Sequence, residues 1–144
     1  MELNFKETKV YTFFPPYDKK IFYSYLGPFF AERHWRNQLP YLINSSTKLW
    51  WVLINQRSVI GFGSLENSDR GFEIGDIYGY TDECWKYVVN ILYYQCKKRN
   101  RYSNIFSDVS KVEPQQLEFF QNKGFEICRE SKNYYFLTKI GYRL

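Results

Sequence analysis

Aromatic side chains are the feature of this sequence that most restricts its fold. They make up 22% of the 144 residues (14 Tyr, 13 Phe and 4 Trp), whereas alanine occurs once, at Ala31. Rings and β-branched side chains pack well on pleated sheets, while a helical bundle normally relies on strong helix formers such as alanine. The composition therefore argues against an all-helical fold and favours a core built on a β-sheet.

The length and overall composition predict one globular domain over residues 1–144. A chain of this size can bury a hydrophobic core without disulfides or a structural metal. Hydrophobic residues are 44% and charged residues 24%, which is ordinary for a globular protein and unlike a disordered one. The sequence has no apolar run of membrane-spanning length and does not begin with a secretory signal pattern. We therefore expect a cytoplasmic protein without membrane contact.

Charge and cysteine content limit the ligands that we expect. The net charge is +5, but the basic residues are scattered, and the densest group, Lys97 to Arg101, falls at the end of an expected helix, where cations complement the helix dipole. Nucleic acid is therefore an unexpected partner. Three cysteines without CxxC spacing and a single histidine, His34, make a Cys/His zinc site improbable, so we expect no metal and reduced thiols.

Hydrophobic spacing predicts alternating strands and helices along the chain. We expect strands at residues 9–14, 48–54, 59–66, 72–80, 105–109, 125–130 and 134–140, and helices at 19–26, 29–39, 82–99 and 114–123. Gly27 and Pro28 separate the first two helices in this prediction. The order β-α-α-β-β-β-α-β-α-β-β predicts an α/β fold, with a mixed sheet of about six to seven strands and flanking helices.

Three segments within residues 48–140 resemble the GNAT superfamily of acyl-CoA-dependent N-acyltransferases. Residues 119–125, FFQNKGF, resemble the family segment "fYeklGF", in which a short helix ends at glycine before a strand. The helix at residues 85–99, WKYVVNILYYQCKKR, is similar to the family helix "GkaLleaaleeAkkr". Residues 73–79, EIGDIYG, are similar to the family strand "EIxxLyV". The order of the expected elements over the same range also matches that family.

The resemblance implies where a coenzyme would bind. In this superfamily the fourth strand separates from the fifth, and its free backbone groups hold the pantetheine arm of CoA, while amides at the start of the next helix hold the diphosphate. By resemblance, Ile77, Tyr78 and Gly79 would face pantetheine. Tyr80, Thr81, Trp85 and Lys86 would lie in the diphosphate segment. Acetyl-CoA is the implied co-substrate, and no metal is implied.

The resemblance also implies a catalytic base. Family members often use a carboxylate early on the fourth strand to take a proton from the acceptor amine, and Glu73 falls at that position. Asp76 is a second candidate, which we expect on the opposite face because of its strand parity. Phe120 replaces the tyrosine that often protonates the departing thiolate. The implied function is acyl transfer, most simply acetyl transfer, to a small-molecule or protein amine by a monomer or homodimer.

Two alternatives remain open at this point. The segment from Tyr80 to Trp85 contains neither Arg nor Gly, and glycine normally lets a phosphate approach the backbone. A GNAT-shaped module that has lost CoA binding and holds a protein or a small molecule is therefore the main alternative, and a nucleic-acid-associated protein is the third. Arg33, His34, Trp35 and Arg36 could face an acceptor, although we expect His34 and Trp35 to be packing residues.

Overall fold

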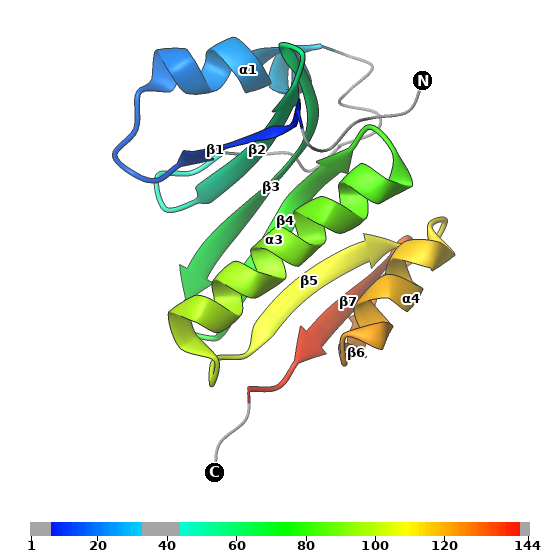
Figure 1. Cartoon of the computed structure of the whole chain (residues 1–144). Helices are drawn as coiled ribbons and strands as arrows, with labels where there is room; N and C mark the ends of the chain where they lie inside the picture. The colour runs from blue at the N-terminus through cyan, green and yellow to red at the C-terminus, as the bar shows by residue number, and fades with distance from the viewer. Residues whose placement is uncertain (1–6, 33–43, 142–144) are drawn as a thin grey trace. The chain divides into compact units, whose positions relative to one another are not determined.

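The computed structural model describes residues 7–32 and 44–141. In chain order the elements are β1 (Lys9–Phe13), α1 (Lys19–Ala31), β2 (Leu49–Asn55), β3 (Ser58–Ser68), β4 (Gly71–Gly79), α3 (Asp82–Asn100), β5 (Ile105–Ser110), α4 (Pro114–Asn122), β6 (Glu126–Glu130) and β7 (Tyr134–Lys139). The α/β prediction is confirmed, and outside the first helical region the predicted boundaries agree to within two residues (Figure 1).

The seven strands form a mixed sheet in the order β1-β2-β3-β4-β5-β7-β6. β4 and β5 are parallel, whereas β5–β7 and β6–β7 are antiparallel. Parallel neighbours need a long crossover connection, which α3 supplies between β4 and β5. The hairpin between β2 and β3 turns through Gln56 and Arg57, whose φ angles of 50° and 68° match the positive values of a two-residue type I′ turn.

α1 corrects one sequence prediction. A break was expected at Gly27 and Pro28, but the helix continues through both and ends after Ala31, where the amide of Glu32 donates to the Pro28 carbonyl. Its inward stripe, Phe22, Leu26 and Phe29, is buried on both sides of the proline. Burial of that stripe outweighs the local cost of a proline within a helix. Residues 33–39 of the expected second helix lie outside the described residues.

By its internal contacts the chain divides into two compact units. The first comprises residues 1–64 and 76–89, and the second comprises residues 65–75 and 90–144. The boundaries fall within β4, after Gly75, and within α3, after Val89. Because both elements run through both units, the prediction of a single domain over residues 1–144 stays a prediction.

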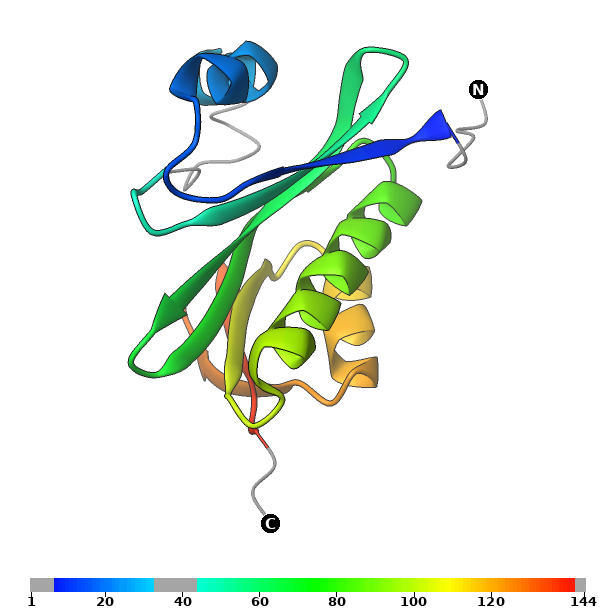
Figure 2. The ribbon, with the colours of Figure 1, turned by 60° about the vertical axis from the view of Figure 1, so that its left-hand side comes forward.

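The first unit contains the aromatic core that the composition predicted. α1 lies over one face of β1, β2 and β3 in both ribbon views (Figures 1 and 2). Phe22 of α1, Trp50 of β2 and Phe62 of β3 are completely buried. The ring centroids of Phe22 and Trp50 lie 5.4 Å apart, and those of Phe29 and Phe62 lie 5.0 Å apart. These separations are typical of favourable aromatic pairs, so rings supply much of this core.

The second unit has helices on one face of its strands. The C-terminal half of α3 and the whole of α4 cover the same face of β5 and β7 (Figures 1 and 2). Phe120 of α4 is completely buried, and its ring meets that of Phe125 edge-on at 5.0 Å. Gly124 between them has a φ angle of +95°. That left-handed conformation confirms the predicted glycine after the end of the helix.

Candidate functional site

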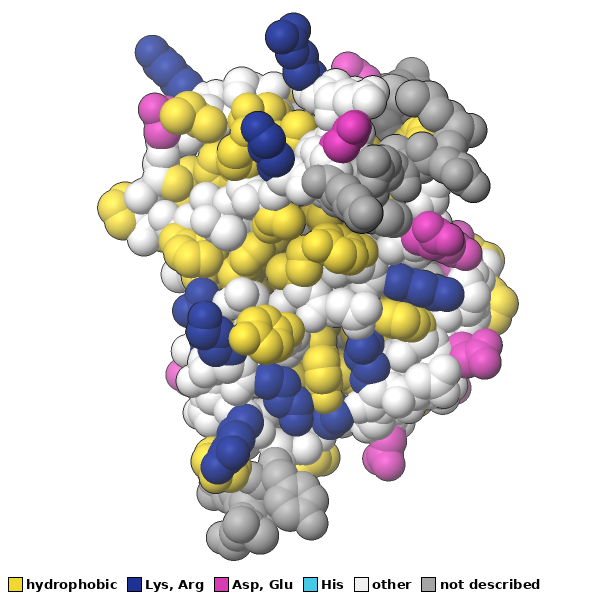
Figure 3. Space-filling view, viewed as in Figure 1, with side chains coloured by type: hydrophobic (Ala, Val, Ile, Leu, Met, Phe, Trp, Pro, Cys, Tyr) yellow, Lys and Arg dark blue, Asp and Glu magenta, His cyan; other side chains and the backbone are white. Residues whose placement is uncertain are grey.

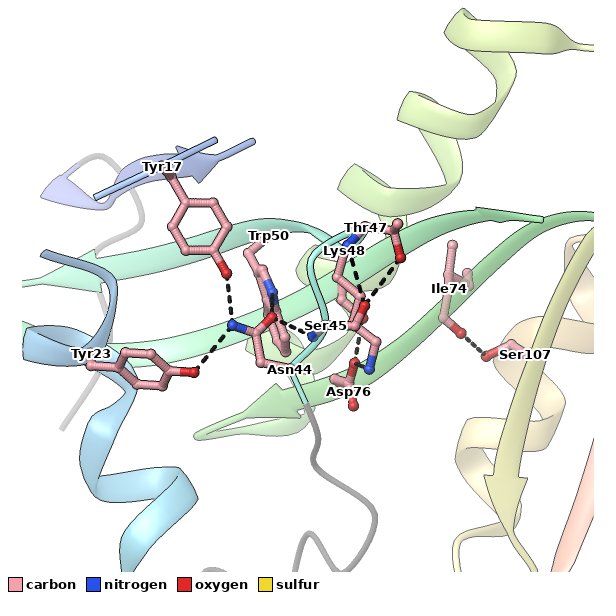
Figure 4. Close-up of polar contacts among 11 residues, drawn as sticks. Tyr17, Tyr23, Asn44, Ser45, Thr47, Lys48, Trp50, Ile74, Asp76 and Ser107 are labelled. Carbon is pink, nitrogen blue, oxygen red and sulfur yellow. Dashed lines mark hydrogen bonds and ion pairs between the residues drawn. The ribbon is translucent and has the colours of Figure 1, made fainter. Parts of the chain in front are cut away.

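The parallel ladder between β4 and β5 is short. It contains two residue pairs, Phe72–Ile105 and Glu73–Phe106. At the next position the Ser107 hydroxyl donates to the Ile74 carbonyl at 2.9 Å (Figure 4). A side chain thus takes the place of a main-chain partner where the ladder stops. β4 continues to Gly79 with no further ladder pair to β5.

Glu73 lies in the last pair of this ladder. Its neighbours on the strand, Phe72 and Ile74, are 5% and 2% exposed, whereas the Glu73 side chain is exposed. The alternation of a β-strand therefore directs Phe72 and Ile74 into the core and the Glu73 carboxylate toward solvent. A carboxylate in that position can exchange protons with a ligand, and its role as a base remains a prediction.

Asp76 interrupts the regular strand. Its φ angle is +52°, a left-handed conformation that aspartate adopts more readily than most residues. Its Oδ2 accepts from Lys48 Nζ at 2.8 Å and from Ser64 Oγ at 2.5 Å (Figure 4). The sequence analysis placed Asp76 on the face opposite Glu73 by assuming that side chains alternate along a regular strand. The left-handed conformation of Asp76 departs from that regular geometry. The sequence analysis did not predict the contacts with Lys48 and Ser64, because both residues are distant in the chain.

A second polar cluster fixes the segment that leads into β2. Asn44 donates from Nδ2 to the hydroxyls of Tyr17 at 2.7 Å and Tyr23 at 3.2 Å. Its Oδ1 accepts from Trp50 Nε1 at 2.9 Å (Figure 4). This cluster joins the α1 region to β2 immediately before Lys48, and thereby helps to hold the lysine that contacts Asp76. It was also missed from sequence, since its members show no common spacing.

Residues predicted to face pantetheine lie at the end of β4. Tyr78 packs its ring on Phe29 at 5.0 Å and on Phe62 at 5.3 Å. Burial, with smaller effects from Tyr80 and Cys84, raises the pKa of its phenol above the ordinary value of 10.0, so the hydroxyl is neutral at physiological pH. Ile77 and Gly79 are partly exposed. A Cβ on Gly79 would lie 2.2 Å from the Trp85 amide nitrogen, so the strand can approach α3 this closely only through glycine.

The start of α3 carries the residues predicted to hold a diphosphate. Thr81 caps the helix, because its Oγ1 accepts from the Cys84 amide at 3.1 Å. Its carbonyl accepts from the Trp85 amide at 3.0 Å. Within the described part of the chain, the amides of Asp82 and Glu83 have no such acceptor. Free first-turn amides can bind an anion.

The side chains around that turn differ in exposure. Tyr80 is 68% exposed and Lys86 is also exposed, so both can reach a ligand in solution. Trp85 is only 7% exposed and contributes to the core of the first unit. Of the residues predicted to contact the diphosphate, Tyr80 and Lys86 are therefore exposed and Trp85 is a packing residue. The Thr81 hydroxyl is already used to cap the helix.

Four further predictions concern the residues expected to face an acceptor, a metal site, a membrane span and the position of the usual tyrosine acid. Arg33, His34, Trp35 and Arg36 lie outside the described residues. Within residues 7–32 and 44–141, no group of three or more His, Cys, Asp or Glu side chains is arranged to hold a metal ion. No helix in those same ranges combines the length and hydrophobicity needed to cross a membrane. Phe120, at the position of the usual tyrosine acid, is a core residue.

No family model matches the sequence, and no curated protein matches it either. Several solved structures do match this chain. An acyl-CoA N-acyltransferase from Pseudomonas aeruginosa superposes with a TM-score of 0.72 at 7% identity, covering 92% of this chain and 99% of that one. ElaA from Escherichia coli gives 0.70 at 11% identity, with the same coverage. The chain has the fold of the GNAT acetyltransferases.

A third GNAT structure, the N-acetyltransferase PseH from Campylobacter jejuni, was solved in complex with acetyl coenzyme A. It superposes with a TM-score of 0.60 at 16% identity, covering 92% of this chain and 98% of that one. The resemblance predicted from residues 48–140 is thus confirmed at the level of the fold and extends over most of the chain. The short ladder lies between β4 and β5, the two strands that the GNAT resemblance expects to separate.

Proposed function

We propose that this protein is an acyl-CoA-dependent N-acyltransferase that transfers an acetyl group from acetyl-CoA to an amine. The observation that carries the proposal is the early end of the β4–β5 ladder in a chain with the GNAT fold. β4 has no ladder pair to β5 after Glu73, and we place the thioester ligand against this part of the strand. Backbone groups do this work, which is why an unusual set of side chains is compatible with the function.

The coenzyme would bind along the end of β4 and the start of α3. The main chain of Ile77, Tyr78 and Gly79 would contact pantetheine. The amides of Asp82 and Glu83 would take a diphosphate oxygen, with Lys86 adding positive charge. The carboxylates of Asp82 and Glu83 oppose that binding, so we expect weaker affinity than in a site built from glycine and arginine.

The reaction would proceed by direct attack. Glu73 accepts a proton from the acceptor ammonium, and the free amine attacks the thioester carbonyl carbon. A preorganised β4 amide donates to the carbonyl oxygen as negative charge develops on it. The tetrahedral intermediate then loses its second nitrogen proton to water as the carbon–sulfur bond breaks, which releases the neutral amide product and the CoA thiolate. Phe120 has no proton to donate, so we assign protonation of the thiolate to water.

The acceptor and the setting follow from the same proposal. An exposed Glu73 suits a cationic amine that arrives from solvent, which includes small-molecule amines and protein amines. The three cysteines, Cys84, Cys96 and Cys128, are all free thiols. Free thiols agree with the cytoplasmic location expected from the sequence, which stays a prediction, as does a monomeric or homodimeric state.

Coenzyme binding is the first test. Acetyl-CoA at 100 times its dissociation constant should stabilise the folded protein by about 2.7 kcal/mol, which a thermal-shift measurement resolves. The same titration with acetate and CoA fragments gives the contribution of each part. The absence of any shift at millimolar acetyl-CoA would reject the enzyme and favour the alternative of a GNAT-shaped binding module.

Glu73→Gln tests the base. Removing a general base should lower kcat by about 10²–10⁴-fold, while acetyl-CoA binding is retained because the main chain holds the coenzyme. Release of the CoA thiol, followed with a chromogenic disulfide over a panel of amines, measures turnover. Glu126→Gln, an equally exposed glutamate on β6, serves as the matched control and should leave kcat unchanged. Unchanged turnover in Glu73→Gln would remove Glu73 from the mechanism.

A further inference from the structure

Three lysine side chains of the second unit converge on one tyrosine. The Nζ atoms of Lys97, Lys123 and Lys139 lie 5.5, 5.1 and 5.0 Å from the ring centroid of Tyr93. Lys97 is on α3, Lys123 directly follows α4, and Lys139 ends β7. Three elements that are separate in the chain therefore bring three positive charges around one tyrosine ring.

The arrangement is held by specific contacts. Lys139 Nζ donates to the Tyr93 hydroxyl and to the Lys123 carbonyl, both at 2.5 Å. Gly124 leaves room for Lys139, since a Cβ at that position would lie 3.3 Å from Lys139 Nζ and the lysine would have to shift by a few tenths of an ångström. Lys123 also stacks over Phe119 at 4.7 Å. Two of the three lysines are half-buried, so the cluster is partly built into the fold.

No carboxylate neutralises this cluster among the residues that the structure describes. The ion pairs Lys48–Asp76 and Lys111–Glu130 lie elsewhere in the described residues and involve none of the three lysines. Burial, together with the neighbouring Lys139, lowers the pKa of Lys123. Proximity to a second ammonium group is thus unfavourable for the charged form of Lys123. Figure 3 shows Lys and Arg side chains gathered around apolar ones on the face that carries α3 and α4.

A phosphate group matches the chemistry of this cluster. Lysine is a compact cation that binds phosphate as a point charge, whereas planar carboxylates are recognised best by the forked donors of arginine. An ammonium group can donate to a phosphate oxygen, and the Tyr93 hydroxyl, which already accepts from Lys139, still has its own proton to donate. A bound phosphate would also relieve the repulsion among the lysines.

We propose that Lys97, Lys123, Lys139 and Tyr93 form a binding site for a phosphate-bearing ligand. The site uses the C-terminal half of α3, whereas the proposed diphosphate contacts lie at the other end of that helix. It is independent of the acyltransferase proposal, because binding of a phosphate here requires no catalytic group.

Inorganic pyrophosphate is the probe for this site. Calorimetric titration of the full chain should show saturable binding, and amide resonances of Tyr93 and Gly124 should shift in nuclear magnetic resonance spectra. Lys97→Gln and Lys123→Gln should each weaken binding by roughly tenfold, the usual effect of losing one charged contact. Lys97 is exposed, so its replacement leaves the fold intact. Lys132→Gln, an exposed lysine between β6 and β7, is the matched control and should bind like the parent.

The source of the phosphate is distinguished by competition. Displacement of pyrophosphate by acetyl-CoA, but not by its 3′-dephospho form, would identify the coenzyme's 3′-phosphate as the ligand group. Retention of pyrophosphate in the presence of acetyl-CoA would identify a separate phosphate compound. The proposal fails if pyrophosphate does not saturate at millimolar concentration, or if Lys132→Gln weakens binding as much as Lys97→Gln does.

Discussion

Asp76 shows how one residue can combine unfavourable backbone geometry with favourable contacts. A left-handed conformation costs a non-glycine residue on the order of 1–3 kcal/mol unless its surroundings impose it. Here Lys48 and Ser64 supply that restraint through the carboxylate, whose side chain is 9% exposed, while that of Lys48 is 16% exposed. Removing the carboxylate would leave a largely buried ammonium without this partner.

We therefore expect Asp76→Ala to lower the free energy of unfolding by about 2–4 kcal/mol, measured by urea denaturation. Asp76→Asn should lose less, because asparagine tolerates the left-handed conformation and its side-chain oxygen still accepts a hydrogen bond. Asp69→Ala, an exposed aspartate in the turn before β4, should change stability by no more than about 0.5 kcal/mol. Equal effects at positions 69 and 76 would contradict the role of the Lys48 and Ser64 contacts.

At the scale of the element, the junction of β4 and α3 requires a glycine at position 79. A Cβ on Gly79 would meet the backbone of Trp85 at 2.2 Å, and backbone atoms cannot move aside as a flexible side chain can. Gly79→Ala should therefore displace the first turn of α3 and cost at least about 2 kcal/mol of stability. Thermal unfolding followed by circular dichroism measures the loss.

Gly75→Ala is the matched control for that experiment. Gly75 lies on the same strand, and a Cβ there would find no atom within 4 Å. We expect a neutral or slightly stabilising effect, since alanine has less freedom than glycine in the unfolded chain. A loss equal to that of Gly79→Ala would show that β4 requires glycine for its strand geometry rather than for its contact with α3.

Sequence predicted most elements and only part of the site. Strand and helix positions were confirmed where local periodicity carries the signal, as in β2 and α3, and where a glycine follows a helix, as at Gly124. The break expected at Pro28 was wrong, because burial of a hydrophobic stripe on α1 is a tertiary effect. The Asp76 contacts and the three lysines around Tyr93 join distant segments, so no local pattern could reveal them.

The buried thiols offer a test of cooperativity for the whole molecule. Cys84 and Cys96 are both completely buried on α3, one in each compact unit, while Cys128 is exposed. Burial raises the pKa of the Cys96 thiol to about 12, so it stays protonated in the folded state at neutral pH. The thiolate is the reactive form, and Cys96 is therefore protected by both burial and protonation.

We expect Cys128 to react rapidly with a thiol reagent at pH 8, and Cys84 and Cys96 to react only after unfolding. Because β4 and α3 run through both units, the two buried thiols should become reactive at the same urea concentration. Mass spectrometry of a Cys128→Ser variant resolves the two sites, and peptides around them report labelling separately. Reaction of one thiol at clearly lower urea than the other would show two independently unfolding units.

Ser107 lies where the ladder between β4 and β5 ends. Its hydroxyl donates to the Ile74 carbonyl at the point where β4 and β5 cease to share a ladder. A side-chain oxygen thus joins the two strands immediately beyond their last ladder pair. For protein engineering, position 107 is a place where the contact between β4 and β5 can be changed through a side chain alone.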